Sequence, residues 1–271
     1  MDSPKPLPVA LTIAGSDSGG GAGIQADLKT FHRWGVYGTS ALTAVTAQNT
    51  LGVQEIHPVP PPIIAAQIRS VSEDLAPRAV KSGMLATAEI VTTVAAAIRR
   101  HRLGPYVLDP VMVATSGDTL LERDAVAAVR DELLPLAAIV TPNWAEAALL
   151  AGVPVAEANP RGMARAARVL VEAGAGAALV KGGHLEGDEV VDLYWDGEVE
   201  RVYRGPRTRT RHTHGTGCTL SAAIAAGLAR GEGMEEAAGG AVGWVRAAIS
   251  TAPGLGGGRG PVNHFAEVPT G

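Results

Sequence analysis

The sequence predicts an α/β fold in which a mostly parallel central sheet carries helices on both faces and ends in a small antiparallel edge. Short apolar runs rich in Val, Ile and Leu alternate with Ala-rich runs of helical spacing along most of the 271 residues. The chain is 46% hydrophobic but only 4% aromatic, so small aliphatic side chains must build its core. Near the end of this alternation, the Asp-Gly pair within 195–198 separates two β-branched runs and indicates a hairpin.

Each expected strand is a short apolar run that ends at Gly, Pro or a polar residue, and each expected helix has apolar residues three or four positions apart. The strands are expected at 8–14, 36–46, 79–84, 106–110, 137–140 and 177–184, followed by the antiparallel pair 190–194 and 199–203. The helices are expected at 24–34, 63–75, 88–103, 122–134, 161–173 and 234–250, with two more beginning after Asn143 and after Gly217. No linker or internal repeat divides the chain, so 1–271 is expected to form one domain.

Composition excludes several classes of protein. A net charge of −4 and a pI near 6.0 provide no basic face for a nucleic acid. One cysteine excludes an intramolecular disulfide framework and the common multi-cysteine zinc sites. The first residues lack the pattern of a signal peptide, and no apolar run reaches the length of a membrane span. We therefore expect a cytoplasmic protein without nucleic-acid or membrane partners.

The stretch 212–221 carries the strongest chemical signal. Gly215 and Gly217 stand where a loop becomes an Ala-rich helix, with Thr216 between them. Glycine lets backbone N–H groups approach an anion closely, and a helix start adds unsatisfied donors and a partial positive charge. The pattern is typical of a site for a phosphate, or for charge that develops on one during transfer. A glycine-rich helix start without a ligand is the alternative.

Cys218 falls on the first turn of the same helix. This position lowers the pKa of a thiol and favours its thiolate form, whereas a nearby polyphosphate raises the pKa. The side chain is placed to take a proton from an attacking hydroxyl group. A buried cysteine that packs as a small hydrophobic residue is the alternative.

A second glycine-rich loop, 15–23, follows the first expected strand. Its spacing differs from a dinucleotide-binding fingerprint, no acidic residue follows about twenty residues on, and the sequence contains no Walker A motif. What remains is a flexible loop rich in backbone donors that is able to wrap a small molecule. Asp27 lies one helical turn beyond the loop and points either at that ligand or at solvent.

Two side chains suit a planar heteroaromatic ligand. Gln48 has an amide that donates and accepts at once, which matches an amino group beside a ring nitrogen. Met84 follows a strand and can pack over a ring. Both residues also have ordinary explanations, since an amide can satisfy a turn and a methionine can fill a core.

Asp109, Glu146 and Lys181 all lie just beyond expected strands, where the carboxyl ends of an α/β sheet line a ligand crevice. With the 215–218 loop they supply the parts for phosphoryl transfer from a Mg-nucleotide. The carboxylates can hold Mg²⁺ directly or through water, and the lysine neutralises phosphate charge. Position alone favours a capping-box role for Glu146, because Asn143 precedes it by three residues at a helix start.

Six segments, taken together, identify a family: 14–27, 47–50, 81–84, 109–112, 214–218 and the tail 260–265. They closely resemble the bacterial hydroxymethylpyrimidine/phosphomethylpyrimidine kinases of thiamine biosynthesis, which belong to the ribokinase-like superfamily. The resemblance covers nearly the whole chain. One such motif would be weak, but six in register are highly specific.

The resemblance implies a ribokinase-like homodimer that uses ATP to phosphorylate 4-amino-5-hydroxymethyl-2-methylpyrimidine, and then its monophosphate. It implies that Cys218 stands where most sugar kinases of the superfamily carry an aspartate base. It also implies that Gln48 binds the amino group and ring nitrogen of the pyrimidine. The other implied substrate contacts are Gly15, Asp27 and Met84, and the implied contacts to ATP and Mg²⁺ are Lys181, Asp109, Glu146 and Thr216.

Three other functions compete with this interpretation. A pyridoxal or pyridoxine kinase of the same superfamily accepts a similar planar ring with a hydroxymethyl group, but Gln48 favours the aminopyrimidine edge. A pyrimidine-binding sensor without catalysis would not need the lysine, both carboxylates and the anion loop together. A dinucleotide-dependent oxidoreductase is disfavoured by the spacing of the first glycine loop.

Overall fold

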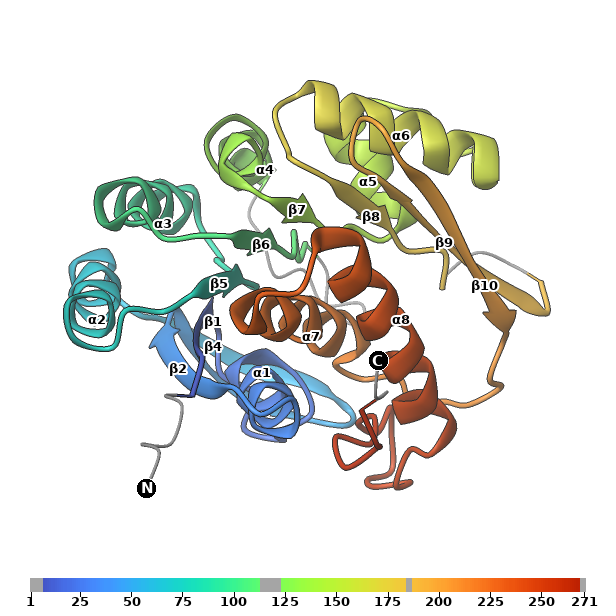
Figure 1. The fold of residues 1–271 in the computed structure, drawn as a ribbon. Coiled ribbons are helices and arrows are strands. Elements are labelled where there is room, and N and C mark those ends of the chain that lie inside the picture. Colours follow the sequence, from blue (N-terminus) through green and yellow to red (C-terminus); the bar gives the residue numbers. More distant parts are fainter. Residues whose placement is uncertain (1–6, 113–122, 184–186, 269–271) are drawn as a thin grey trace, which may run out of the picture.

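A computed structural model of the chain describes residues 7–112, 123–183 and 187–268. Strands and helices alternate in it much as the sequence predicts (Figure 1). The strands are β1 (Val9–Ala14), β2 (Tyr37–Leu42), β3 (Ala44–Asn49), β4 (Gly52–Pro58), β5 (Ala79–Ser82), β6 (Tyr106–Leu108), β7 (Ile139–Val140), β8 (Ala178–Val180), β9 (Glu189–Trp195) and β10 (Glu200–Pro206). The helices are α1 (Gly23–Arg33), α2 (Pro61–Asp74), α3 (Ala88–His101), α4 (Arg123–Ala128), α5 (Trp144–Ala151), α6 (Pro160–Glu172), α7 (Thr216–Arg230) and α8 (Met234–Ser250).

The main sheet has eight strands in the order β10-β9-β8-β7-β6-β5-β1-β2. Neighbouring strands from β2 to β8 run parallel, whereas β8, β9 and β10 pair antiparallel. The Asp-Gly hairpin therefore forms the antiparallel edge that the sequence predicts. All parallel strands end on the same side of the sheet, so the residues that follow β1, β5, β6, β7 and β8 gather at one edge.

Helices cover both faces of this sheet (Figure 1). Leu11 and Ile13 of β1 face a core shared with α2–α6, while Ala10 faces a second core shared with α1, α7 and α8. Half of the buried residues of α7 are alanine, and this helix packs against β1, β5 and β6. Small side chains allow close approach, which brings the first turn of α7 to the carboxyl ends of the central strands.

The expected strand 36–46 is wrong as a single element. The chain leaves the main sheet at Thr43, so that β2 belongs to the eight-stranded sheet and β3 pairs with β4 in a separate antiparallel sheet. A register shift between Ala47 and Gln48 bends this pair. β4 was not predicted, because its polar residues between Gly52 and Pro58 break the alternating apolar pattern of a strand.

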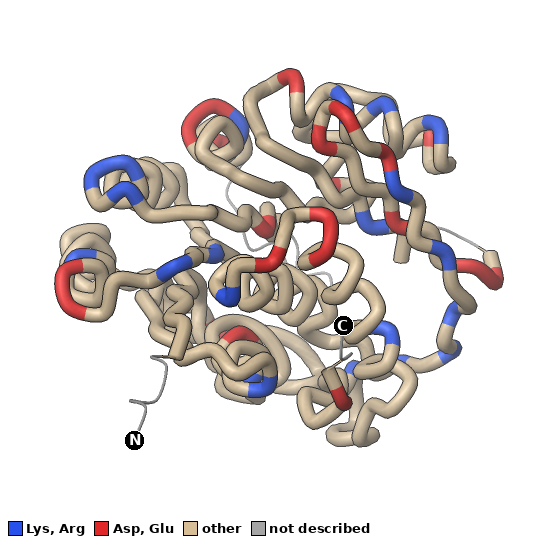
Figure 2. Tube along the Cα trace, in the orientation of Figure 1, with Lys and Arg blue, Asp and Glu red and all other residues tan. Residues whose placement is uncertain are grey.

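The expected helix 122–134 is also irregular. α4 ends at Ala128, a π-helical turn covers Val129–Leu133, and a 3₁₀ turn covers Leu134–Leu136. Pro135 cannot donate a backbone N–H, which limits regular helix at this point. Acidic and basic residues are interspersed over the helices and along the β9–β10 pair (Figure 2). Within the described residues, no helix combines the length and apolar character of a membrane span.

Candidate active site

The anion loop predicted at 215–217 lies at the first turn of α7. Gly215 is the N-cap with φ of 76°, a left-handed conformation that glycine adopts without strain. A Cβ on Gly215 would collide with the carbonyl oxygen of Gly21, so the two glycine loops touch. A Cβ on Gly217 would lie 3.3 Å from Nζ of Lys181 and 3.7 Å from Oδ2 of Asp109. The loop therefore faces the predicted lysine–carboxylate group.

Asp109 and Lys181 come together from different strands. Asp109 follows β6 and is 1% exposed, and Lys181 follows β8. Lys181 Nζ lies 3.3 Å from Asp109 Oδ1, and the hydroxyl of Ser221 on α7 donates to Asp109 Oδ2 at 3.2 Å. Asp109 thus links the sheet edge to α7. The lysine side chain stays 14% exposed, whereas that of Asp109 is 2% exposed.

Glu146 is confirmed as the acid of a capping box at the start of α5. Its Oε2 accepts from the backbone N–H of Asn143 at 2.8 Å, and Asn143 Oδ1 accepts from the backbone N–H of Glu146 at 3.0 Å. The carboxyl group also senses the charges of Lys181 and Asp109. Burial raises the pKa of Glu146 to about 7, and Lys181 offsets only part of this effect. A capping position and a place beside the lysine–carboxylate group are therefore compatible.

Glu146→Gln is expected to remove a pH-dependent loss of stability. The folded pKa of about 7 exceeds the ordinary value of 4.5, so the folded state binds more protons than the unfolded state between these values, and wild-type stability falls as pH rises through this window. The loss is on the order of 2 kcal/mol. Glutamine keeps the capping box. Urea unfolding at about pH 5 and about pH 8 checks this prediction, and equal losses in both proteins would contradict it.

Cys218 lies on the first turn of α7, as predicted, and its surroundings oppose the thiolate form that a helix start favours. Burial raises the pKa of its thiol to about 11, and although Lys81 lowers it, Asp27 and Asp109 raise it further. The backbone N–H of Gly23, at the start of α1, also donates to the sulfur. Desolvation and two nearby carboxylates therefore outweigh the helix start. The thiol is protonated at neutral pH.

Beneath the anion loop lies a fully buried ion pair that the sequence did not predict. Lys81 Nζ lies 2.8 and 3.0 Å from the two carboxylate oxygens of Asp27, and Thr12 donates to Asp27 Oδ2 at 2.6 Å. The expectation that Asp27 points at a ligand or at solvent is wrong, because its carboxylate is fully buried with Lys81. A lysine inside an apolar strand was the available signal, since a buried charge requires a partner.

Gly15, Met84 and Gln48 lie around the first glycine loop. A Cβ on Gly15 would run into Cε of Met84, so these two residues are in contact. The Thr46 hydroxyl donates to the carbonyl oxygen of Ser16 at 2.7 Å, and its oxygen lies 3.3 Å from the side-chain amide of Gln48. Three expected substrate contacts thus lie near the same loop, whereas Asp27 is buried below it.

The loop 15–23 is more constrained than the flexible loop that the sequence suggested. The carboxylate of Asp17 is 1% exposed and accepts from the backbone N–H groups of Gly19, Gly21 and Ala22 at 2.8–2.9 Å. It also lies 2.9 Å from Nε2 of His214, which precedes the anion loop. Neither residue was predicted as functional, although an Asp in a glycine loop commonly accepts hydrogen bonds from backbone N–H groups.

Two helix starts, a lysine and two carboxylates converge at the carboxyl edge of the sheet. Backbone donors can stabilise a phosphoryl group in transfer, and the lysine can neutralise its charge. Such a site on this fold defines a small-molecule kinase of the ribokinase-like class. A family model described as phosphomethylpyrimidine kinase matches residues 17–263. The chain belongs to the phosphomethylpyrimidine kinase family and is a kinase, for which ATP is the phosphate donor.

Individual relatives resemble the chain over nearly its full length. A Rhizobium meliloti protein named hydroxymethylpyrimidine/phosphomethylpyrimidine kinase is 55% identical over 259 residues, or 95% of this chain and 97% of the relative. The structure of a phosphomethylpyrimidine kinase from Clostridium difficile is 41% identical, with a TM-score of 0.79 over 89% of this chain and 99% of that one. The ADP complex of a Bacillus subtilis pyridoxal kinase is 38% identical, with a TM-score of 0.89 over 96% and 98%.

Proposed function

We propose that this chain transfers phosphate from ATP to the hydroxymethyl group of 4-amino-5-hydroxymethyl-2-methylpyrimidine and then to the resulting monophosphate, in thiamine biosynthesis. The observation that carries the proposal is the position of Gly217, which places the anion loop of α7 against Lys181 and Asp109. Family membership supports the choice of substrate. In each step the acceptor oxygen bonds to the γ-phosphorus, the bond to the β-phosphate oxygen breaks, and ADP leaves.

The residues of this site have separate proposed roles. Lys181 binds the transferring phosphate, and the backbone N–H groups of the 215–218 loop stabilise the negative charge of that phosphate. Thr216 contributes to nucleotide binding. Cys218, with a pKa of about 11, holds the acceptor hydroxyl in line. Loose phosphoryl-transfer transition states need little base assistance, so positioning is sufficient for this role. The acceptor proton can leave with the product phosphate.

We also propose that Mg²⁺ accompanies ATP. Among residues 7–112, 123–183 and 187–268, no three His, Cys, Asp or Glu side chains are arranged to hold a metal ion. Asp109 and Glu146 nonetheless form a two-carboxylate set beside Lys181, and Mg²⁺ commonly binds through one or two carboxylates plus phosphates and waters. These two residues would hold the ion, directly or through water, and it would neutralise phosphate charge.

Gln48, Met84 and Gly15 are proposed to bind the substrate ring. Pyridoxal is the second candidate substrate, favoured by the similarity to the pyridoxal kinase structure. The amide of Gln48 matches the ring nitrogen and adjacent amino group of the pyrimidine, a pattern that the phenol and aldehyde of pyridoxal do not present. Gln48 therefore favours the pyrimidine.

ADP release from Mg-ATP tests the substrate directly. We expect turnover with hydroxymethylpyrimidine and with its monophosphate, and little with pyridoxal. Preference for pyridoxal would retain the kinase and overturn the substrate. Tight pyrimidine binding without any turnover would favour a sensor.

We further propose that residues 1–271 form one domain and that the protein works in the cytoplasm.

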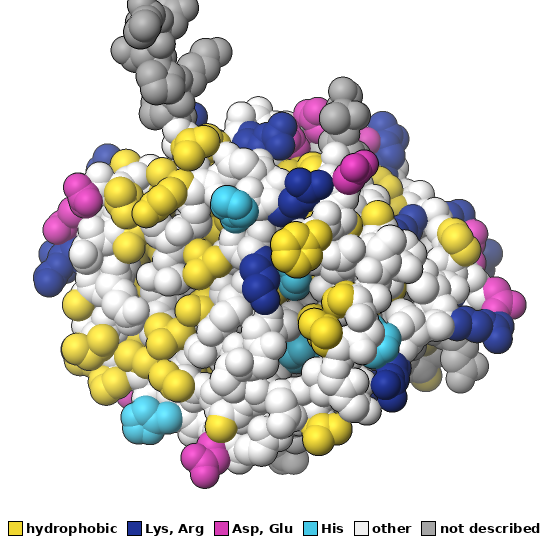
Figure 3. Space-filling model, turned by 90° about the horizontal axis from the view of Figure 1, so that it is seen from below, with side chains coloured by type: hydrophobic (Ala, Val, Ile, Leu, Met, Phe, Trp, Pro, Cys, Tyr) yellow, Lys and Arg dark blue, Asp and Glu magenta, His cyan; other side chains and the backbone are white. Residues whose placement is uncertain are grey.

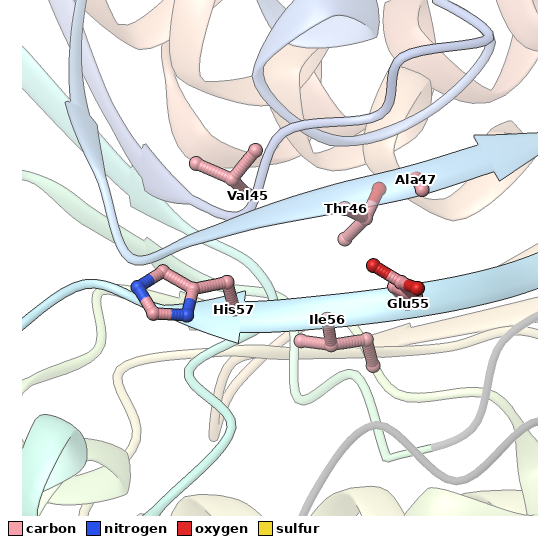
Figure 4. Close-up of a pocket in the computed structure, with 6 residues that line it drawn as sticks. All are labelled: Val45, Thr46, Ala47, Glu55, Ile56 and His57. Carbon is pink, nitrogen blue, oxygen red and sulfur yellow. The ribbon is translucent and has the colours of Figure 1, made fainter.

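We also propose that two copies of the chain associate through the β3–β4 sheet. Side chains of this sheet line a hollow of about 450 Å³, with Val45 and His57 at one end and Ala47 and Glu55 at the other (Figure 4). Val45 and Ile56 are exposed. Figure 3 shows hydrophobic side chains gathered on one half of the face seen from below. Sedimentation equilibrium tests the dimer, and a monomer mass at micromolar concentration would contradict it.

A further inference from the structure

Asp17 is a pure hydrogen-bond acceptor. Burial alone would raise the pKa of this carboxyl group, but hydrogen bonds from His214 and from backbone N–H groups hold the pKa below its usual value. The group is therefore ionised near neutral pH and has no proton to donate. It receives hydrogen bonds from the loop 15–23 on both oxygens.

It follows that Nε2 of His214 carries a proton. This nitrogen lies 2.9 Å from Asp17 Oδ2, and an acceptor-only carboxylate can make that contact only with an N–H. The ring is 8% exposed and lies against Gly21, where a Cβ would collide with its Cδ2 atom. Asp17 thus fixes both the tautomer and the position of the imidazole.

The protonated Nε2 in turn decides which way the amide of Gln48 faces. In the structure Nε2 of the Gln48 amide lies 3.4 Å from His214 Nε2, and Oε1 of the same amide lies 3.3 Å from the Thr46 hydroxyl. A protonated Nε2 has no lone pair to accept an amide N–H, and the two ends of an amide are assigned from their surroundings, so we exchange them and turn the amide oxygen toward His214. The amide NH₂ then donates to Thr46, whose own proton goes to the Ser16 carbonyl oxygen at 2.7 Å.

We propose that Asp17 and His214 are positioning residues that set the orientation of the Gln48 amide, and with it the order of acceptor and donor that the substrate ring meets. The remaining lone pair and N–H of Gln48 bind an adjacent donor and acceptor on the ring in one orientation only. This proposal deepens the proposed function and rests on it. A ring with the opposite order, or without an amino group, loses one of the two bonds.

The same pair joins the two glycine loops. His214 lies directly before the N-cap of α7, and its backbone N–H donates to Gly260 at 3.0 Å. Asp17 holds the loop that touches Gly215 from the other side. The substrate-binding amide is therefore fixed relative to the anion loop, which keeps the ring edge and the acceptor hydroxyl in register.

The kinetic test compares His214→Leu with His214→Gln. Glutamine can place an N–H near the position of Nε2 and donate to Asp17, whereas leucine cannot. In His214→Leu we expect the KM for hydroxymethylpyrimidine to rise about tenfold and the KM for ATP to change less than about twofold. The ratio of kcat/KM for hydroxymethylpyrimidine to kcat/KM for pyridoxal should fall. His214→Gln should restore most of the lost discrimination. His32→Leu, on the exposed surface of α1, is the matched control and should behave as wild type.

Several results would overturn the proposal. One is an equal rise in the KM for hydroxymethylpyrimidine in His214→Gln and His214→Leu, at similar Tm. The other is a rise in the KM for ATP that matches the rise in the KM for the pyrimidine. Nitrogen-15 NMR of the imidazole gives a readout that needs no substrate. Wild type should show His214 with a proton on Nε2, and a pure Nδ1–H tautomer would contradict the proposal. Absence of pyrimidine turnover in wild type would count against the proposed function, and the NMR result would still decide the tautomer.

Discussion

Cys218→Ala is expected to lower kcat by roughly 10²-fold and to leave a measurable residual rate. The loss follows from the position of the thiol on the first turn of α7, where it holds the acceptor hydroxyl beside the anion loop. A residual rate remains because Lys181 and the backbone donors of the loop stay in place. Initial rates of ADP release with saturating hydroxymethylpyrimidine measure the effect, and full activity in the variant would exclude any role in the reaction.

The pH profile separates positioning from proton removal. If the thiolate were the required base, a pKa of about 11 means that its fraction, and the rate, would rise about tenfold per pH unit between pH 7 and 9. We expect a much shallower profile, because the protonated thiol suffices for positioning. A steep rise in wild type that disappears in Cys218→Ala would instead identify the thiolate as the base. Cys218→Ser is the control for size, since it keeps a small polar group at the position.

Residues that follow parallel strands were the easiest to predict. Asp109 and Lys181 are 72 residues apart in sequence, but each ends a strand, and the rule that parallel strands end at one edge is enough to bring them together. Gly215 was predictable for a similar local reason, because the change from glycine to an Ala-rich run marks a helix start. These features depend on chain order and local propensity.

Features that depend on a partner elsewhere in the fold were missed. Nothing near Lys81 in the sequence indicates that Asp27 is its partner, and nothing near Asp17 points to His214. The protonation of Cys218 could not be predicted for the same reason: the helix start is local, but desolvation and the charges of Asp27 and Asp109 come from tertiary packing. The position of the anion site therefore follows from local sequence, whereas the protonation of its side chains depends on tertiary contacts.

Lys81→Met is expected to destabilise the protein by about 3–5 kcal/mol, because it leaves the carboxylate of Asp27 buried and unpaired. Both side chains are fully buried, so solvent cannot take over the role of the partner. Burial by itself lowers the pKa of Lys81, but Asp27, Cys218 and Asp109 together outweigh it and raise that pKa above its usual value, which keeps the lysine charged. Urea unfolding measures the loss. Arg69→Met, at an exposed arginine on α2, is the control for loss of a surface cation and should change stability by less than about 0.5 kcal/mol.

The double variant Lys81→Met/Asp27→Leu distinguishes loss of an ion pair from simple loss of packing. Removal of both charges eliminates the uncompensated carboxylate, so we expect it to recover most of the stability that Lys81→Met loses. The single variant should also lose stability as pH rises. Burial keeps the pKa of Asp27 above its usual value even with Lys81 beside it, and loss of the lysine raises it further, so the variant should lose more stability than wild type as pH rises above the unfolded value of about 3.9. A single variant with the same deficit at about pH 5 and about pH 8, and no recovery in the double variant, would show that Lys81 acts through its aliphatic chain rather than its charge.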